Sequence, residues 1–119
     1  MQDYTVAEFL KIAKYDEESN TYFIEAHWED IFITVGEEDD IYNYGLIGDK
    51  SGSIFVKGEG EGSAFRYGAG EGDACRSGPG KGSAYRYGPG KGSAYRYGPG
   101  DGSVLIDGIE IKINEENAE

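Results

Sequence analysis

The chain has 119 residues, the length of a single domain, and a net charge of −12. It contains 20 Gly and 10 Tyr but few aliphatic residues, so a conventional layered core would have to come mainly from residues 1–47 and the last strand. The single cysteine, Cys75, excludes an intrachain disulfide, and no apolar run approaches the roughly 18 residues of a membrane span.

The charge is unevenly distributed along the chain. Residues 1–50 carry 13 acidic residues and three Lys, whereas residues 51–106 carry five acidic residues and seven Lys or Arg. Such asymmetry points to partners more than to a fold. The first ten residues lack the basic and apolar regions of a signal peptide, so we expect a cytoplasmic protein that does not bind membranes.

The first 46 residues are predicted to form an acidic α+β cap. Residues 5–15 have apolar side chains at helical spacing, and Thr5 and Glu8 match a capping box at the helix start. Residues 21–28 and 31–35 are strand-like and are expected to pair as a hairpin over 21–35. The run 36–40 is then an acidic loop.

Residues 47–106 consist of six ten-residue units in strict register. The units are 47–56, 57–66, 67–76, 77–86, 87–96 and 97–106. Positions 2 and 6 are always Gly, and positions 7 to 1 of the next unit are rich in Tyr, Phe and Ile, which indicates a short strand between glycine corners. A fixed period predicts stacked coils, so we expect a mainly β protein with a narrow glycine-rich β-solenoid of ten-residue coils. The competing interpretation is a disordered low-complexity segment, which the strict register disfavours.

Alternation along each strand separates positions 8 and 10 from positions 7, 9 and 1. Position 10 is Arg in four units, and an interior Arg without partners would be too costly. This predicts an inward column at position 9: Phe55, Phe65, Cys75, Tyr85, Tyr95 and Leu105. The terminal units instead place aliphatic residues on the Ala/Arg side, which would fit a side covered by the acidic N-terminal segment.

The closing segment, 107–119, is predicted to contain a last strand and a frayed acidic tail. Residues 104–106, the pair Asp107-Gly108 and residues 109–113 fit a hairpin with a type I′ turn. The tail 114–119 is expected to be frayed.

The first candidate site is a stripe of stacked arginines with tyrosines beside it. In-register coils would place matching side chains about 4.8 Å apart. Such a stripe would bind an anion, and aromatic platforms beside it would suit a single-stranded nucleic acid or a nucleotide. The alternative is neutralisation by the acidic N-terminal segment or by a neighbouring subunit, which the acidity of the whole chain favours. The stripe comprises Arg66, Arg76, Arg86, Arg96, Tyr67, Tyr87 and Tyr97.

The second candidate site is the acidic run Glu37, Glu38, Asp39 and Asp40. It would mimic a phosphate backbone towards a basic partner protein, or it is simply a solvated loop.

Little in the sequence indicates catalysis. His27 is the only His and is expected to be structural, and Cys75 has no base placed to activate it. The Gly-x-Gly lattice is not followed by GK[ST], so it is not a phosphate-binding loop. We therefore expect a non-enzymatic protein without metal or cofactor.

The run GSAYRYGPGKGSAYRYGPGDGSVLIDGIEI resembles small glycine-rich proteins of tailed phages, in which Gly-x-Gly and Asp-Gly-Ser repeats end in a short apolar strand with an Ile-Asp-Gly turn. The resemblance covers about residues 45–113, and the alternation of Arg and Tyr departs from it. It implies a phage or mobile-element origin and a host-cell location. We expect a protein that binds a host protein or complex, as an inhibitor of a host defence system. One alternative is a structural or adhesin module of the virion or tail tip, with a homo-oligomer as a further option, and another is direct binding of nucleic acid or a nucleotide.

Overall fold

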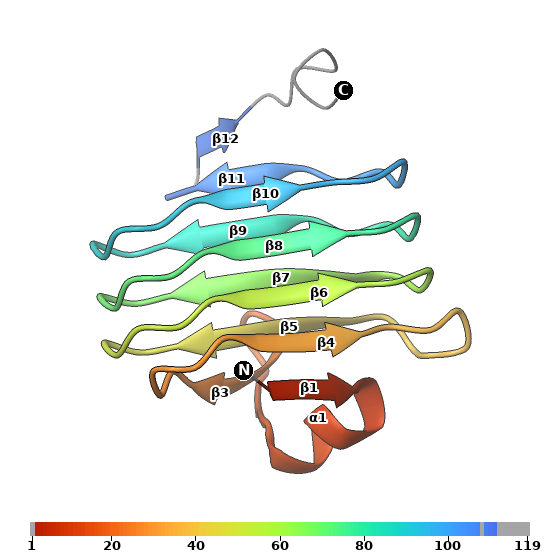
Figure 1. Cartoon of the computed structure of the whole chain (residues 1–119), viewed down its shortest axis with the longest axis horizontal. Coiled ribbons are helices and arrows are strands. Elements are labelled where there is room, and N and C mark those ends of the chain that lie inside the picture. The colour runs from red at the N-terminus through yellow and green to blue at the C-terminus, as the bar shows by residue number, and fades with distance from the viewer. Residues whose placement is uncertain (1, 108, 112–119) are drawn as a thin grey trace.

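The computed structural model describes residues 2–107 and 109–111, and it shows a flattened β-solenoid (Figure 1). Two sheets form the opposite walls of the coil. From one edge to the other, sheet A contains β1 (Gln2–Thr5), β4 (Ile31–Thr34), β6 (Ile54–Lys57), β8 (Ala74–Ser77) and β10 (Ala94–Arg96). Sheet B contains β12 (Ile109–Ile111), β11 (Val104–Ile106), β9 (Ala84–Tyr87), β7 (Gly62–Tyr67), β5 (Tyr42–Ile47), β3 (Thr21–Glu25) and β2 (Lys14–Asp16).

One coil of the repeat takes 20 residues. Ala64 pairs in parallel with Ala84 in sheet B, and Ala74 pairs with Ala94 in sheet A. The predicted β-solenoid is confirmed, whereas its coil is twice as long as the ten residues expected. Each unit supplies one strand and one glycine corner that reverses the chain, so two units are needed to close a turn. Tyr85 therefore stacks on the residue 20 positions earlier, and Tyr95 lies on the opposite wall.

The glycine corners allow successive coils to stack at backbone distance. Gly72 donates its N–H to the Lys91 carbonyl at 3.0 Å, and a Cβ at Gly72 would lie only 1.8 Å from the Gly52 carbonyl oxygen. Gly68 has a φ of +113°, a conformation that residues with a side chain rarely adopt. The corners therefore need glycine both for its conformation and for the missing side chain.

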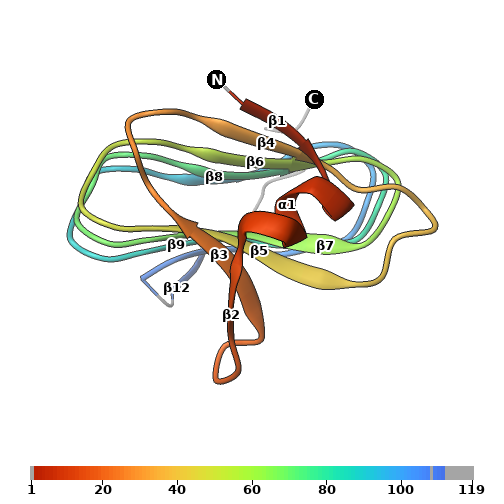
Figure 2. The same ribbon diagram turned by 90° about the horizontal axis from the view of Figure 1, so that it is seen from below.

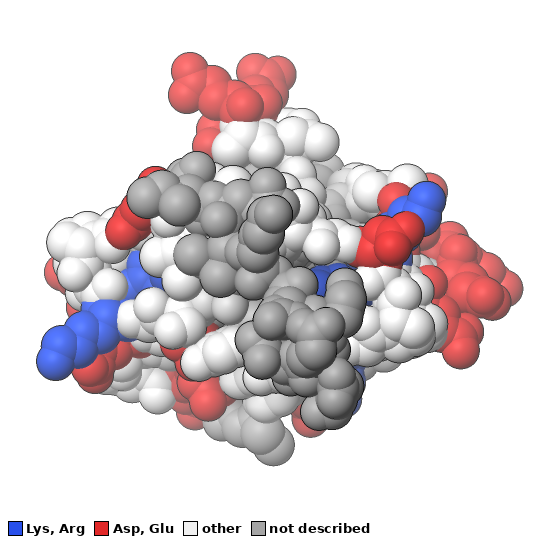
Figure 3. Space-filling model, turned by 90° about the horizontal axis from the view of Figure 1, so that it is seen from above, with Lys and Arg blue, Asp and Glu red and all other residues white. Residues whose placement is uncertain are grey.

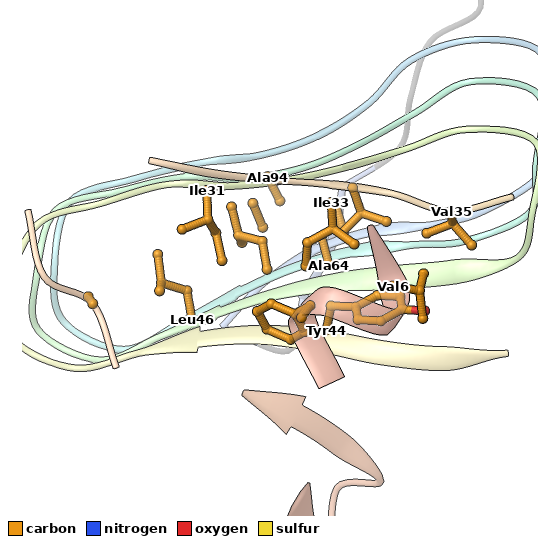
Figure 4. Packing of buried hydrophobic residues seen from close by; sticks show 14 of the residues in the cluster. Val6, Ile31, Ile33, Val35, Tyr44, Leu46, Ala64 and Ala94 are labelled. Carbon is orange, nitrogen blue, oxygen red and sulfur yellow. The ribbon is translucent and has the colours of Figure 1, made fainter. Parts of the chain in front are cut away.

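The interior of the coil changes character along its axis. Near the N-terminal end it is filled by larger apolar side chains, including Ile31, Ile33, Val35 and Leu46 (Figure 4). In the repeat it narrows to a column of buried alanines at position 8, with the position-10 residues beside them. The prediction of an inward column at position 9 is wrong, because positions 8 and 10 point inward. These inward alanines are Ala64, Ala74, Ala84 and Ala94.

The N-terminal end is closed by the helix α1 (Val6–Ile12), which lies at the lower end of the stack in Figure 1 and across the space between the two walls in Figure 2. The predicted capping box is confirmed: Glu8 N–H donates to the Thr5 hydroxyl at 3.1 Å, and Thr5 N–H donates to the Glu8 carboxylate at 2.9 Å. Val6 and Phe9 are buried against the core. The helix is shorter than the predicted range 5–15, because β2 begins at Lys14. Within the described residues, no helix is long and apolar enough to cross a membrane.

Two other expectations for the N-terminal segment are corrected. The hairpin over 21–35 does not form, because β3 joins sheet B between β2 and β5 while β4 joins sheet A between β1 and β6. β4 pairs in parallel with β6 of the repeat, and β3 pairs in parallel with β5, which in turn pairs with β7 of the repeat. The stack thus begins near residue 21, and the predicted boundary after residue 46 falls inside β5.

At the C-terminal end, β11 and β12 pair antiparallel with Ile106 opposite Ile109, which confirms the predicted hairpin. Asp107 has a φ of 52°, as the first residue of a type I′ turn requires. The second turn residue, Gly108, and the tail 114–119 lie outside the described residues.

Candidate functional site

The four repeat arginines lie inside the coil. The side chains of Arg66, Arg76 and Arg86 are at most 1% exposed, and Arg96 is 7% exposed. Arg66 stacks with Arg86 in sheet B, and Arg76 with Arg96 in sheet A. The predicted surface stripe of arginines is therefore wrong. Neither interpretation of that stripe predicted the hydrogen-bond partners of these side chains.

Backbone carbonyls of the glycine corners solvate the buried guanidinium groups. Arg86 Nε donates to the Gly72 carbonyl at 2.8 Å, and its Nη2 donates to the Gly70 carbonyl, also at 2.8 Å. Its Nη1 donates to the carbonyl of Tyr87. The same acceptors recur for the other arginines, 14 and 16 positions earlier in the chain. Charge-assisted hydrogen bonds of this kind offset the cost of burying a cation.

The buried arginines keep their charge at neutral pH. Burial lowers the pKa of Arg66 to about 10, and the neighbouring Arg86 lowers it in the same direction. Burial, aided by Arg96, likewise lowers the pKa of Arg76 to about 10. These cations serve the scaffold and are not available to an external anion.

The outer face of sheet B carries four stacked aromatic rings, which we call the aromatic face: Phe65, Tyr67, Tyr85 and Tyr87. The Phe65 and Tyr85 ring centroids are 4.3 Å apart, and those of Tyr67 and Tyr87 are 5.1 Å apart. Along the strands, Phe65 lies 5.7 Å from Tyr67, and Tyr85 lies 6.3 Å from Tyr87. All four are half-buried, so the rings form one partly exposed platform.

The sequence predicted only part of this face. Tyr67 and Tyr87 were expected at the surface, whereas Phe65 and Tyr85 were expected inside, and the alternation of strand residues places all four outside. Tyr97 does not join them. It follows directly after β10 on the opposite wall, is 54% exposed, and has its ring 5.9 Å from that of Tyr95.

The aromatic face is uncharged but has carboxylates near it. Burial, aided by Tyr87 and Asp16, raises the pKa of Tyr67 to about 12. The pKa of Tyr87 is also raised, first by burial and then by Tyr85 and Asp107. Both hydroxyls therefore stay protonated at neutral pH and can donate hydrogen bonds.

The predicted acidic loop lies at a corner of the solenoid and is joined there by further carboxylates. The loop is closed by a hydrogen bond from Gly36 N–H to the Asp39 carboxylate at 2.7 Å. Acidic side chains protrude at the right-hand edge of Figure 3. Glu37, Glu38, Asp39 and Asp40 line one groove together with Glu59 and Glu61 of the next coil.

The single thiol is poorly suited to nucleophilic chemistry. Cys75 is 6% exposed, and burial, aided by Asp73, raises the pKa of its thiol to about 11.

His27 Nδ1 lies 3.1 Å from the carbonyl oxygen of Glu25. Across residues 2–107 and 109–111, no three His, Cys, Asp or Glu side chains gather in a way that could hold a metal ion.

Comparisons of the chain with protein-family models, with curated proteins and with solved structures find no match. What bears on its function is therefore the geometry of its own residues.

Proposed function

We propose that the chain is a non-catalytic binding protein that docks a partner protein on the aromatic face. The observation that carries the proposal is the stack of four half-exposed rings on one flat wall. Tyr is enriched at protein interfaces because it offers a large, rigid contact area at a low entropic cost. The rings are held by their cross-strand neighbours, so little further ordering would accompany binding.

The resemblance to tailed-phage proteins supports a host protein as the partner, and inhibition of a host defence system as the role. The acidity of the chain supports a partner with a basic surface. Nucleic acid is disfavoured, because the arginines that would have met its phosphates are buried. A role as a tail-tip module rests on the resemblance alone.

The test is a pull-down from host lysate that compares two matched double variants. Tyr85→Ser/Tyr87→Ser removes half of the aromatic face, whereas Tyr95→Ser/Tyr97→Ser removes the matching two residues on the opposite wall, in a segment (91–100) whose sequence is identical to 81–90. We expect the first variant to lose the partner that the wild type recovers in stoichiometric amount, and the second to retain it.

Thermal melting of both variants serves as the control, since each loses ring contacts that contribute about 0.2–1 kcal/mol per pair. Equal recovery by both variants, or a wild type that recovers only nucleic acid or nothing, rejects the proposal.

A further inference from the structure

An exposed tryptophan stands at the corner of the solenoid opposite the acidic loop. Trp28 is the only Trp of the chain, and its side chain is 69% exposed. Its φ is 68°, a left-handed conformation that is unusual for a bulky residue. A hydrogen bond from Trp28 N–H to the Ser51 carbonyl, 2.8 Å long, ties it to the next coil.

Two hollows adjoin the ring, with volumes of about 470 and 380 Å³. Trp28, Ser51 and Glu71 line both of them. Their walls come from the corners of successive coils and carry more carboxylates than cations. The acidic lining residues are Asp30, Asp49, Glu71 and Asp73, and the basic lining residues are Lys50 and Lys91.

A cation of the chain itself already lies over the tryptophan ring. Lys50 Nζ is 5.2 Å from the ring centroid, within the range of a cation–π contact, and 4.0 Å from the Asp49 carboxylate. The Trp28 ring and the Asp49 carboxylate thus both contact the same ammonium group at the surface. Because Lys50 is about half-exposed on a flexible side chain, an external cation can displace it.

The carboxylates of this corner differ in how they are used. Asp30 accepts a hydrogen bond from Ser53 N–H at 3.0 Å, and Asp73 accepts one from Ser93 N–H at 2.8 Å, so both fasten one coil to the next. Glu71 is exposed and adjoins both hollows. Asp49 already lies beside the Lys50 ammonium, whereas Glu71 is the lining carboxylate that the two hollows beside Trp28 share.

We propose that Trp28 and Glu71 form a binding site for an arginine side chain of a partner protein, which Lys50 occupies in the free chain. A guanidinium fits better than an ammonium, because it is planar, stacks on aromatic faces and can bond a carboxylate through two N–H groups. The surplus of negative charge at the corner favours such a ligand over an acidic one. This site is separate from the aromatic face, and the inference holds whether or not that face binds a partner.

The test uses the single indole N–H of the chain as a specific signal in ¹⁵N-correlated NMR spectra. The probe is N-acetyl-arginine methylamide, titrated at constant ionic strength, and the corresponding lysine and glutamate derivatives are the comparisons. We expect a saturable shift of the indole signal with the arginine probe, weaker binding of the lysine probe and no response to the glutamate probe.

Matched variants assign the effect to residues. Glu71→Gln should weaken binding of the arginine probe by about two- to fivefold, the range of an exposed ion pair, while Glu61→Gln, at the same repeat position on the opposite edge, should not. Lys50→Met should strengthen binding of the arginine probe, because no cation of the chain then competes for the Trp28 ring, while Lys57→Met should not. The proposal is overturned if the indole signal does not saturate, if the three probes act alike, or if each variant matches its control.

Discussion

At the scale of single residues, the arginines show how a charged side chain can be part of a core. The cost of an interior Arg without partners predicts an outward position 10. The partners are backbone carbonyls, because the glycine columns place a corner 14 to 18 positions before each Arg. The one usable signal was the replacement of Arg by Val56 and Ile106 in terminal units, which marks position 10 as interior.

Replacing Arg86 by Met should destabilise the fold by about 2–4 kcal/mol, because the carbonyls of Gly70 and Gly72 lose their buried donor. The shift of the urea midpoint measures this loss. Lys81→Met, at an exposed position, is the control and should leave the midpoint unchanged. A variant as stable as the wild type would contradict the structural role given to the guanidinium.

Tyr67 predicts a loss of stability at alkaline pH. Its pKa is about 12 in the folded chain and about 10 when unfolded, so the unfolded state releases this proton first as the pH rises. The stabilisation from the neutral phenol is fully present below pH 10 and is lost as the pH rises to 12. The arginines oppose this trend, because Arg66 and Arg76 lose protons more readily when folded.

The Tyr67 contribution is isolated by comparison with Tyr67→Phe. Urea midpoints measured from about pH 9 to pH 12 should show the wild type losing stability relative to the variant. A difference between the two proteins that does not change with pH would contradict the raised pKa.

At the scale of elements, the sequence indicates most strands but not which wall each joins. Glycine columns and aromatic positions mark the repeat strands, and the closing hairpin follows from Asp107-Gly108. Because all units are nearly identical, the period alone does not distinguish a unit that closes a turn from one that closes half of it. For the same reason the period does not predict the aromatic face, since Phe65 and Tyr85 are neighbours only when one coil takes 20 residues.

The corner geometry predicts that Gly72→Ala disrupts stacking. Its Cβ would lie 1.8 Å from a backbone oxygen that is fixed in the neighbouring coil, so the loss should be about 3 kcal/mol or more. Thermal melting checks this, with Gly36→Ala as the control, where the nearest atom would lie 3.4 Å away in ordinary contact. Equal melting temperatures for the two variants would show that the corners are looser than described.

At the scale of the whole molecule, each coil contacts only its neighbours along the axis. In such proteins stability is approximately a sum over repeats and the interfaces between them. The aromatic face belongs to the middle coils, so it can be lengthened without changing either end of the stack.

Inserting a second copy of residues 77–96 adds one full coil and should raise the urea midpoint, because it adds an interface without removing one. It should also extend the aromatic face by another Tyr pair. Circular dichroism and urea titration measure the first effect, and partner binding measures the second. A lower midpoint than that of the wild type would indicate that the coils do not stack as independent units.

The enclosed guanidinium groups also change how the protein meets its surroundings. Of the net charge of −12, four positive charges are held along the axis, which leaves −16 for all other residues. At distances within the screening length of the solution, an approaching molecule meets a polyanion wrapped around a cationic centre. Encounters with basic proteins should therefore be fast at low ionic strength and slow markedly as salt is added.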